Sequence, residues 1–223
     1  MVVSITKLSR SSWFKIKAKN NIIHIDPGYI GDFENQGIPE GELEEKADLI
    51  LITHFHKDHL QKEALDKIYS QDTVILAPQT LENGINGKKI KSNEELKFND
   101  IKIKAVDAYN TPKGSSTKKF HKKGENVGYI LSVDNKIIYH AGDTDFIHEM
   151  KEFRDIDLSL IPIGGTFTMD IKESVEAVLA IKPKIAIPMH MKEANPEEFK
   201  KMVEEKSDIK VKLLEIGETY KLG

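Results

Sequence analysis

The sequence predicts a single α/β or α+β domain, and three observations support this. The chain has 223 residues, which is enough for one domain with a large core. Short apolar strand patterns come first in each half of the chain, and helical patterns follow them. Neither a linker nor a short-period repeat divides the chain, so we expect residues 1–223 to form one domain.

The expected elements follow from the spacing of apolar residues. In the first half we expect strands at 2–8, 13–17, 21–26, 47–52 and 73–77, helical spacing from Leu60, and a short helix at 78–81. In the second half, residues 88–91, 94–98 and 101–106 alternate as half-exposed antiparallel strands do. A hairpin at 127–133 and 136–140, strands at 158–161, 183–188, 209–214 and 218–222, and helices at 175–181 and from Pro196 complete the pattern.

The composition limits the class of protein. Hydrophobic residues make up 39% and charged residues 31%, as in a soluble globular protein, and the net charge of -3 gives no basic signature for nucleic acid. The chain has no cysteine, which excludes disulfides and thiolate metal sites. No apolar run reaches the length of a membrane span, and residues 1–14 lack the apolar core of a secretion signal. We therefore expect a cytoplasmic protein with a small-molecule partner; the sequence indicates no oligomeric state.

One stretch, Thr53–His59, carries most of the candidate chemistry. It places His54, His56, Asp58 and His59 directly after the apolar run 47–52, in what reads as a loop at a strand end. Open α/β sheets place their chemistry there, and imidazole and carboxylate are usual ligands of zinc. A loop allows these four side chains to converge, whereas a lone histidine would be better explained as a solvated surface residue.

The motif His-x-His-x-Asp-His resembles the metallo-β-lactamase superfamily. A later aspartate of that family is matched by Asp143 in the segment 140–145, and its last histidine by His190 in the segment 187–190. Residues 161–169 also resemble small cytosolic members, among them ascorbate-6-phosphate lactonase-like proteins. The resemblance runs from about Ser12 to the C-terminus, and it implies a four-layer αββα sandwich.

The resemblance implies two metal sites, zinc in the first instance, with manganese or iron as alternatives. His54 and His56 would belong to site one, Asp58, His59 and His190 to site two, and Asp143 would bridge the two. Two metals about 3.5–4 Å apart can share a hydroxide and lower its pKa towards neutrality. Site two is complete in this sequence.

Site one departs from the family pattern at its third histidine. After the strand 101–106 the chain has Asp107-Ala108-Tyr109-Asn110, and no histidine lies between His59 and His121. Three alternatives are open: Asn110 ligates weakly through its amide oxygen, His121 enters from the lysine-rich loop 107–125, or site one keeps two histidines and the bridge or stays empty. Asp107 is a minor fourth choice of ligand. If His121 is no ligand, it is an exposed residue.

Other residues are candidates for supporting roles. Asp26 is expected either to hold metal ligands from behind or to form an Asx turn, and His24 is interpreted as structural. Tyr109 is a candidate to polarise an oxyanion, and Thr166, beside Gly164-Gly165, is a candidate for substrate contact. His140 is expected to contact substrate or to pack at a strand end. Loop 107–125 is either a solvated, mobile connector or a lid or wall beside the metal.

The function implied is a metal-dependent hydrolase. A metal-bound hydroxide would attack an ester, lactone or phosphodiester, and Asp58 or Asp143 would handle the proton. One alternative is a nuclease-type phosphodiesterase, which the lysines of 113–123 favour and the acidic balance disfavours. Another is a mono-iron or metal-binding member without hydrolytic activity.

Overall fold

The computed structural model describes residues 2–78 and 87–223. The chain divides into two compact units, the first comprising residues up to Ile90 together with Leu214–Gly223, and the second comprising Lys91–Leu213. The described residues of each unit build one seven-stranded sheet. No helix among residues 2–78 and 87–223 has the length and apolar character needed to cross a membrane.

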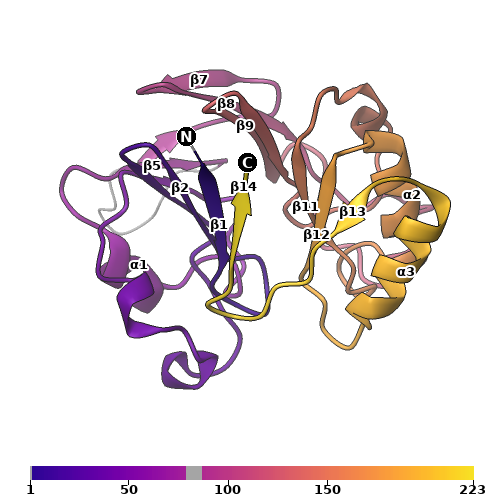
Figure 1. Ribbon diagram of the computed structural model, residues 1–223, viewed down its shortest axis with the longest axis horizontal. Coiled ribbons are helices and arrows are strands. Elements are labelled where there is room, and N and C mark those ends of the chain that lie inside the picture. The colour runs from indigo at the N-terminus through magenta and orange to yellow at the C-terminus, as the bar shows by residue number, and fades with distance from the viewer. Residues whose placement is uncertain (1, 79–86) are drawn as a thin grey trace. The chain divides into compact units, whose positions relative to one another are not determined.

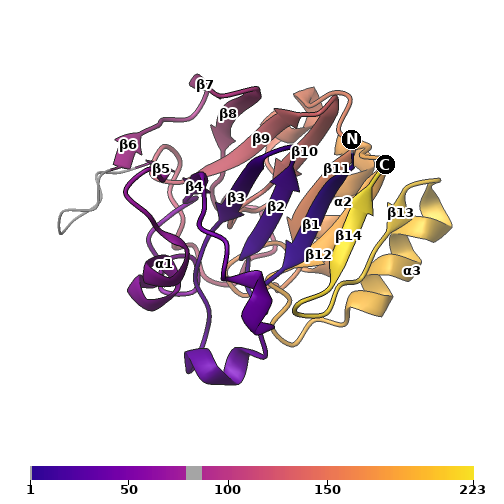
Figure 2. The same cartoon turned by 60° about the vertical axis from the view of Figure 1, so that its left-hand side comes forward.

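The first unit contains a sheet with strand order β14-β1-β2-β3-β4-β5-β6, in which β14, β1, β2 and β3 run antiparallel and β3 to β6 run parallel (Figure 2). Buried side chains from two strands, helix α1 and the first loop form its core cluster, which includes Trp13, Ile50, Leu65 and Ile75. The elements are β1 (Val3–Lys7), β2 (Phe14–Ala18), β3 (Asn21–Ile25), η1 (Phe33–Gln36), η2 (Glu40–Glu42), β4 (Leu49–Leu51), α1 (Lys62–Ile68), β5 (Val74–Ala77), β6 (Gly87–Lys89) and β14 (Thr219–Leu222).

The second unit repeats this plan with the strand order β13-β12-β11-β10-β9-β8-β7. Strands β7 to β10 run antiparallel, and β10 to β13 run parallel. The elements are β7 (Glu95–Phe98), β8 (Ile101–Asp107), β9 (Val127–Val133), β10 (Lys136–His140), η3 (His148–Glu152), β11 (Leu158–Pro162), α2 (Ile171–Ile181), β12 (Ile185–Met189), α3 (Pro196–Lys206) and β13 (Lys210–Val211).

The two long helices of the second unit begin at side-chain caps. Asp170 accepts a hydrogen bond from Glu173 N (2.9 Å) at the start of α2, and Asn195 accepts one from Glu197 N (3.0 Å) before α3, whose first residue is Pro196. The helices pack against each other, and they lie side by side in Figure 1. They bury apolar stripes that include Val178 and Phe199.

Most expected elements are present, with three differences. The strand expected at 88–91 is observed at Gly87–Lys89 and pairs in parallel with β5, because it closes a parallel sheet edge instead of an antiparallel hairpin. The strand expected at 209–214 has only the two residues Lys210–Val211 in its ladder. The short helix expected at 78–81 falls almost entirely outside the described residues.

His24 on β3 lies fully buried in the first unit, where Trp13 Nε1 donates a hydrogen bond of 2.9 Å to His24 Nδ1. Burial, and to a smaller extent the charge of Lys15, its partner across β2 and β3, lower the pKa of His24 to about 3. The imidazole is therefore neutral in the native protein, and His24 is a structural residue of the sheet.

The pH dependence of stability tests this role of His24. The pKa is lower in the folded than in the unfolded state, so its contribution to stability is complete above about pH 6.5 and is lost as the pH falls towards 3. The loss is about 1.4 kcal/mol per pH unit, or about 2 kcal/mol at pH 5. Denaturant unfolding of wild type and His24→Leu at pH 5 to 8 should show the difference between them shrinking by this amount.

An exposed histidine, His148, supplies the control for removal of an imidazole. The His148→Leu protein should follow the wild-type curve. Wild-type and His24→Leu curves that run parallel from pH 8 to pH 5 would contradict the assignment.

Candidate functional site

The Thr53–His59 loop begins where β4 ends, at the carboxyl edge of the parallel part of its sheet. The chain beyond β3 lies next to it, since Asp26 N donates to Leu51 O (2.9 Å). His54 and His59 are buried, Asp58 is half-buried and His56 is exposed. The four predicted ligand residues of the first unit thus emerge together at one strand end.

Asp26 organises this loop from behind. Its carboxylate accepts hydrogen bonds from Thr53 N (2.7 Å), Thr53 Oγ1 (2.7 Å) and His59 Nδ1 (2.7 Å), and the side chain is fully buried. The backbone of Asp26 has φ 51°, a left-handed conformation that non-glycine residues rarely adopt. Three charge-assisted hydrogen bonds offset the cost of burying the carboxylate, and they fix both ends of the Thr53–His59 loop.

These contacts decide which ring nitrogen carries the proton in two histidines. A carboxylate only accepts, so His59 Nδ1 carries the proton and Nε2 holds the ring's lone pair. The single proton of Thr53 Oγ1 goes to Asp26, so this hydroxyl accepts the proton of His54 Nδ1 at 3.0 Å. In both rings Nε2 is then the nitrogen that can bind a metal.

His54 and His56 aim nitrogens at a common region. His54 Nε2 and His56 Nδ1 are 3.0 Å apart, with ring planes 83° apart. Two nitrogens bound to one tetrahedral zinc are roughly 3.3 Å apart, given bonds of about 2.0–2.1 Å. The pair thus has the spacing of two ligands of one ion.

Asp58 is oriented by a residue that sequence analysis did not single out. Ser11, in the loop between β1 and β2, donates its hydroxyl proton to Asp58 Oδ2 (3.0 Å), and that oxygen lies 3.8 Å from His59 Nε2. Nothing in the spacing of Ser11 indicates this role, since it depends on a contact 47 residues away in sequence. Sequence analysis also assigned no supporting role to Thr53, although it directly precedes the first histidine.

In the second unit, two histidines, the predicted ligand His190 and the alternative ligand His121, meet at the carboxylate of Asp143. Asp143 Oδ2 lies 3.3 Å from His190 Nε2 and 3.5 Å from His121 Nε2, and all three side chains are about 2% exposed or less. Asp143 follows β10, and His190 follows β12 with φ 48°. His121 is therefore buried beside Asp143, and the expectation of an exposed residue is wrong.

Asn110 holds His121 in this position. Asn110 Oδ1 accepts hydrogen bonds from His121 N (2.9 Å) and His121 Nδ1 (3.0 Å), while Asn110 Nδ2 donates to Phe167 O (2.9 Å). An amide oxygen has no proton to give, so Nδ1 carries the proton and Nε2, which faces Asp143, holds the lone pair. Both ends of the Asn110 amide are thus engaged within the protein.

Of the three candidates for substrate contact, two are tied to the protein. The Tyr109 hydroxyl donates to Glu149 (3.2 Å), and burial together with the Glu149 charge raises the pKa of Tyr109. His140 is fully buried, and its Nδ1 accepts from Gly142 N (3.2 Å) in the turn before Asp143. Thr166 is half-buried, and its hydroxyl bonds to no group within residues 2–78 and 87–223.

The lysine-rich loop, residues 107–125, is anchored at several points. Buried Asp145 accepts from Thr111 N (2.8 Å) and Lys119 Nζ (3.0 Å), and Glu173 at the start of α2 accepts from Ser115 N (2.8 Å). Residues 111–119 are therefore fixed to the rest of their unit, which favours a wall over a mobile connector.

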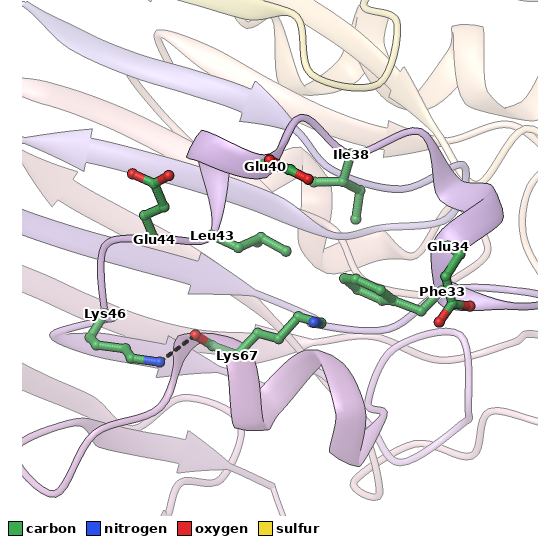
Figure 3. A pocket seen from close by; sticks show the side chains of 8 residues that line it. All are labelled: Phe33, Glu34, Ile38, Glu40, Leu43, Glu44, Lys46 and Lys67. Carbon is green, nitrogen blue, oxygen red and sulfur yellow. Dashed lines mark hydrogen bonds between the residues drawn. The ribbon is translucent and has the colours of Figure 1, made fainter.

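A separate cavity of about 620 Å³ in the first unit is lined by residues of loop 28–46 and by Lys67. Figure 3 shows Phe33, Ile38 and Leu43 pointing into it, with Lys67 reaching towards the Phe33 ring at 4.7 Å from its centre. The lining residues include none of the candidate ligands, so this cavity is distinct from the histidine cluster.

Gly28 lies against the motif so closely that no side chain fits. A Cβ at this position would be 2.5 Å from His59 N and 2.6 Å from the Asp58 carbonyl carbon. Gly28→Ala should displace the motif loop and destabilise the metal-free protein by about 1–3 kcal/mol, with a lower metal content after loading. Denaturant unfolding and elemental analysis measure the two effects.

The matched control is Gly41→Ala, because a Cβ there meets no atom within 4 Å. It should leave stability and metal content nearly unchanged. Equal behaviour of the two alanine variants would show that the close approach at Gly28 does not constrain the loop.

Comparison with known proteins places this geometry in a family. Residues 4–190 match the family described as the beta-lactamase superfamily domain. A UPF0173 metal-dependent hydrolase of Pyrococcus furiosus is 36% identical, over 99% of this chain and 100% of the relative. A metallo hydrolase of Ignicoccus hospitalis superimposes with a TM-score of 0.81 at 26% identity, covering 100% of this chain and 99% of the other.

A metallo-β-lactamase fold protein of Bacillus subtilis, YhfI, superimposes with a TM-score of 0.75 over 99% of both chains, at 10% identity. That similarity concerns the fold alone. The chain therefore belongs to the beta-lactamase superfamily, within the UPF0173 family of metal-dependent hydrolases, and has the metallo-β-lactamase fold that the resemblance of its motif implies.

Proposed function

We propose that this protein is a dinuclear zinc hydrolase of small-molecule esters, lactones or phosphodiesters, and that its two units act as one catalytic domain. The observation that carries the proposal is the shared state of three buried imidazoles. His54, His59 and His121 each donate Nδ1–H to a protein oxygen, which leaves Nε2 as the metal-binding atom. Such preset tautomers are typical of metal ligands.

The donor set fits the metal. Imidazole and carboxylate suit zinc, and also manganese or iron, and the chain has no thiolate to offer. The spacing of the His54 and His56 nitrogens supports a shared ion. We assign one ion to His54, His56 and His121, the other to Asp58, His59 and His190, and the bridging position to Asp143.

His121 is proposed as the third ligand of the first ion, and Asn110 as the residue that orients it. The amide oxygen of Asn110 already accepts two hydrogen bonds from His121, and imidazole is a better zinc ligand than an amide. This choice accounts for the asparagine at the position where the family pattern has histidine.

When bound, the metal ions would supply Lewis-acid chemistry and lower the pKa of water. The chain's own residues would hold the proton and the substrate. Asp58 is better placed than Asp143 to accept and release a proton, because its side chain is 21% exposed to solvent whereas that of Asp143 is 2% exposed. Thr166 suits substrate contact through its half-buried hydroxyl, whereas Tyr109 must first release Glu149 to donate.

A panel of esters, lactones and phosphodiesters tests the activity. Chelated protein should be inactive and should regain turnover with zinc, and His190→Ala should lose both metal and turnover by at least about a hundredfold. The exposed His148→Ala is the matched control and should keep both. Turnover that survives chelation, or that survives His190→Ala, would contradict the proposal.

Zinc titration by calorimetry separates the roles of His121 and Asn110. His121→Ala should abolish binding of one equivalent. Asn110→Ala should weaken the same equivalent by about 10- to 100-fold, because the ring loses its orienting acceptor. Asn110→Asp keeps an acceptor oxygen for His121 Nδ1 but loses the donor to Phe167 O, so it should bind this equivalent more tightly than Asn110→Ala and less tightly than wild type.

The opposite pattern identifies Asn110 as the ligand. In that case His121→Ala would leave both equivalents in place, and Asn110→Ala would remove one of them outright.

A further inference from the structure

Two lysine ammonium groups from distant parts of the second unit lie over the ring of Phe167. Lys192 Nζ lies 3.8 Å from the ring centre and Lys118 Nζ lies 5.4 Å from it. Lys118 belongs to the anchored lysine-rich loop, and Lys192 follows His190 by two residues. Two other chain segments thus converge on the half-buried ring of Phe167.

These two ammonium groups differ from their neighbours in having no counter-charge. Lys119 is paired with Asp145 (3.0 Å) and Lys123 with Glu149 (2.7 Å). Across residues 2–78 and 87–223, no carboxylate lies within 4.0 Å of Lys118 or Lys192. The face of one phenyl ring compensates an ammonium only weakly, so both groups remain available to an anion.

An apolar surface adjoins these charges. The Phe120 side chain is 59% exposed, and its ring centre lies 5.3 Å from that of Phe167 with the planes tilted by 32°. A large exposed ring beside a second, half-buried ring offers a platform for an apolar group. The chemical complement of this surface is an oxyanion attached to an aromatic or alicyclic body.

The surface is joined to the residues that support the proposed metal ligands. Asn110, which orients His121, donates to Phe167 O, and Phe120 directly precedes His121. Lys118 N donates to Thr166 O (2.8 Å), which fixes the loop to the Phe167 segment. Lys192 has φ 48°, a conformation that costs about 1–3 kcal/mol, so its placement is maintained against strain.

We propose that Lys118, Lys192, Phe120 and Phe167 form a subsite for an organic anion, so that the substrate carries a carboxylate or phosphate next to an apolar ring. The assignment of this anion to the substrate rests on the proposed hydrolase function. Binding of the anion itself does not, because the four residues lie outside the proposed ligand set.

Binding to chelated, metal-free protein tests the subsite without contributions from metal or turnover. The probes are benzoate and phenyl phosphate, with benzamide as the neutral analogue, followed by ligand-observed nuclear magnetic resonance. Both anions should bind more tightly than benzamide. Added salt should weaken the binding of the two anions and leave the binding of benzamide unchanged. The ratio of benzoate to phenyl phosphate affinity decides between a carboxylate and a phosphate.

Variants identify the residues. Lys118→Gln and Lys192→Gln should each weaken anion binding by roughly 2- to 5-fold, and together by about tenfold, with benzamide unaffected. Lys113→Gln, in the same loop, is the matched control and should bind as wild type does. Phe167→Leu should weaken all three probes, because each uses the ring.

Equal affinity for benzoate, phenyl phosphate and benzamide in metal-free wild type would overturn the subsite. So would a double lysine variant that binds the anions as tightly as Lys113→Gln does. A single-stranded oligonucleotide that binds these lysines far more tightly than phenyl phosphate would replace the small anion with a nucleic acid. Failure of zinc-loaded wild type to hydrolyse any ester, with the anion preference intact, would overturn only the hydrolase function.

Discussion

The buried carboxylate of Asp26 is the interaction on which the first half of the candidate site depends. It accepts three hydrogen bonds of 2.7 Å, two from Thr53 and one from His59, within fully buried surroundings. A buried carboxylate is costly unless its oxygens are satisfied, so these donors and the carboxylate hold one another in place. Through the Thr53 hydroxyl the effect reaches His54, and one residue thereby sets the tautomers of two predicted ligands.

Asn110 has the corresponding role in the second unit, with a neutral amide in place of a carboxylate. It orients His121 towards Asp143, as Asp26 orients His59. The same residue links this arrangement to Phe167, and so to the two lysines without counter-charges. The same residues would then orient the proposed metal ligand and hold the proposed anion subsite. The loop that carries them is already fixed by Asp145 and Glu173.

Both units use the same topology to present these side chains. Each has an antiparallel meander followed by parallel strands, and the predicted ligands leave from strand ends: the Thr53–His59 loop after β4, Asp143 after β10 and His190 after β12. The carboxyl ends of parallel strands collect side chains at one edge of a sheet. Close approaches at Gly28 and Gly164, where a Cβ would meet His59 N at 2.5 Å and His190 O at 2.4 Å, keep these loops compact.

The sequence by itself determined the fold class and most strand positions, because apolar periodicity is written along the chain. It also made Asp58 and His59 candidate ligands through a local motif, and Asp143 and His190 through the family resemblance of that motif. Only the tertiary structure decided that the lysine-rich loop buries His121 beside Asp143 and that Asn110 orients this histidine. The parallel pairing of Gly87–Lys89 and the support of Asp58 by Ser11 were likewise hidden. The physical reason is that a hydrogen bond between distant segments depends on how loops close, and loop closure has no periodic signature in a sequence.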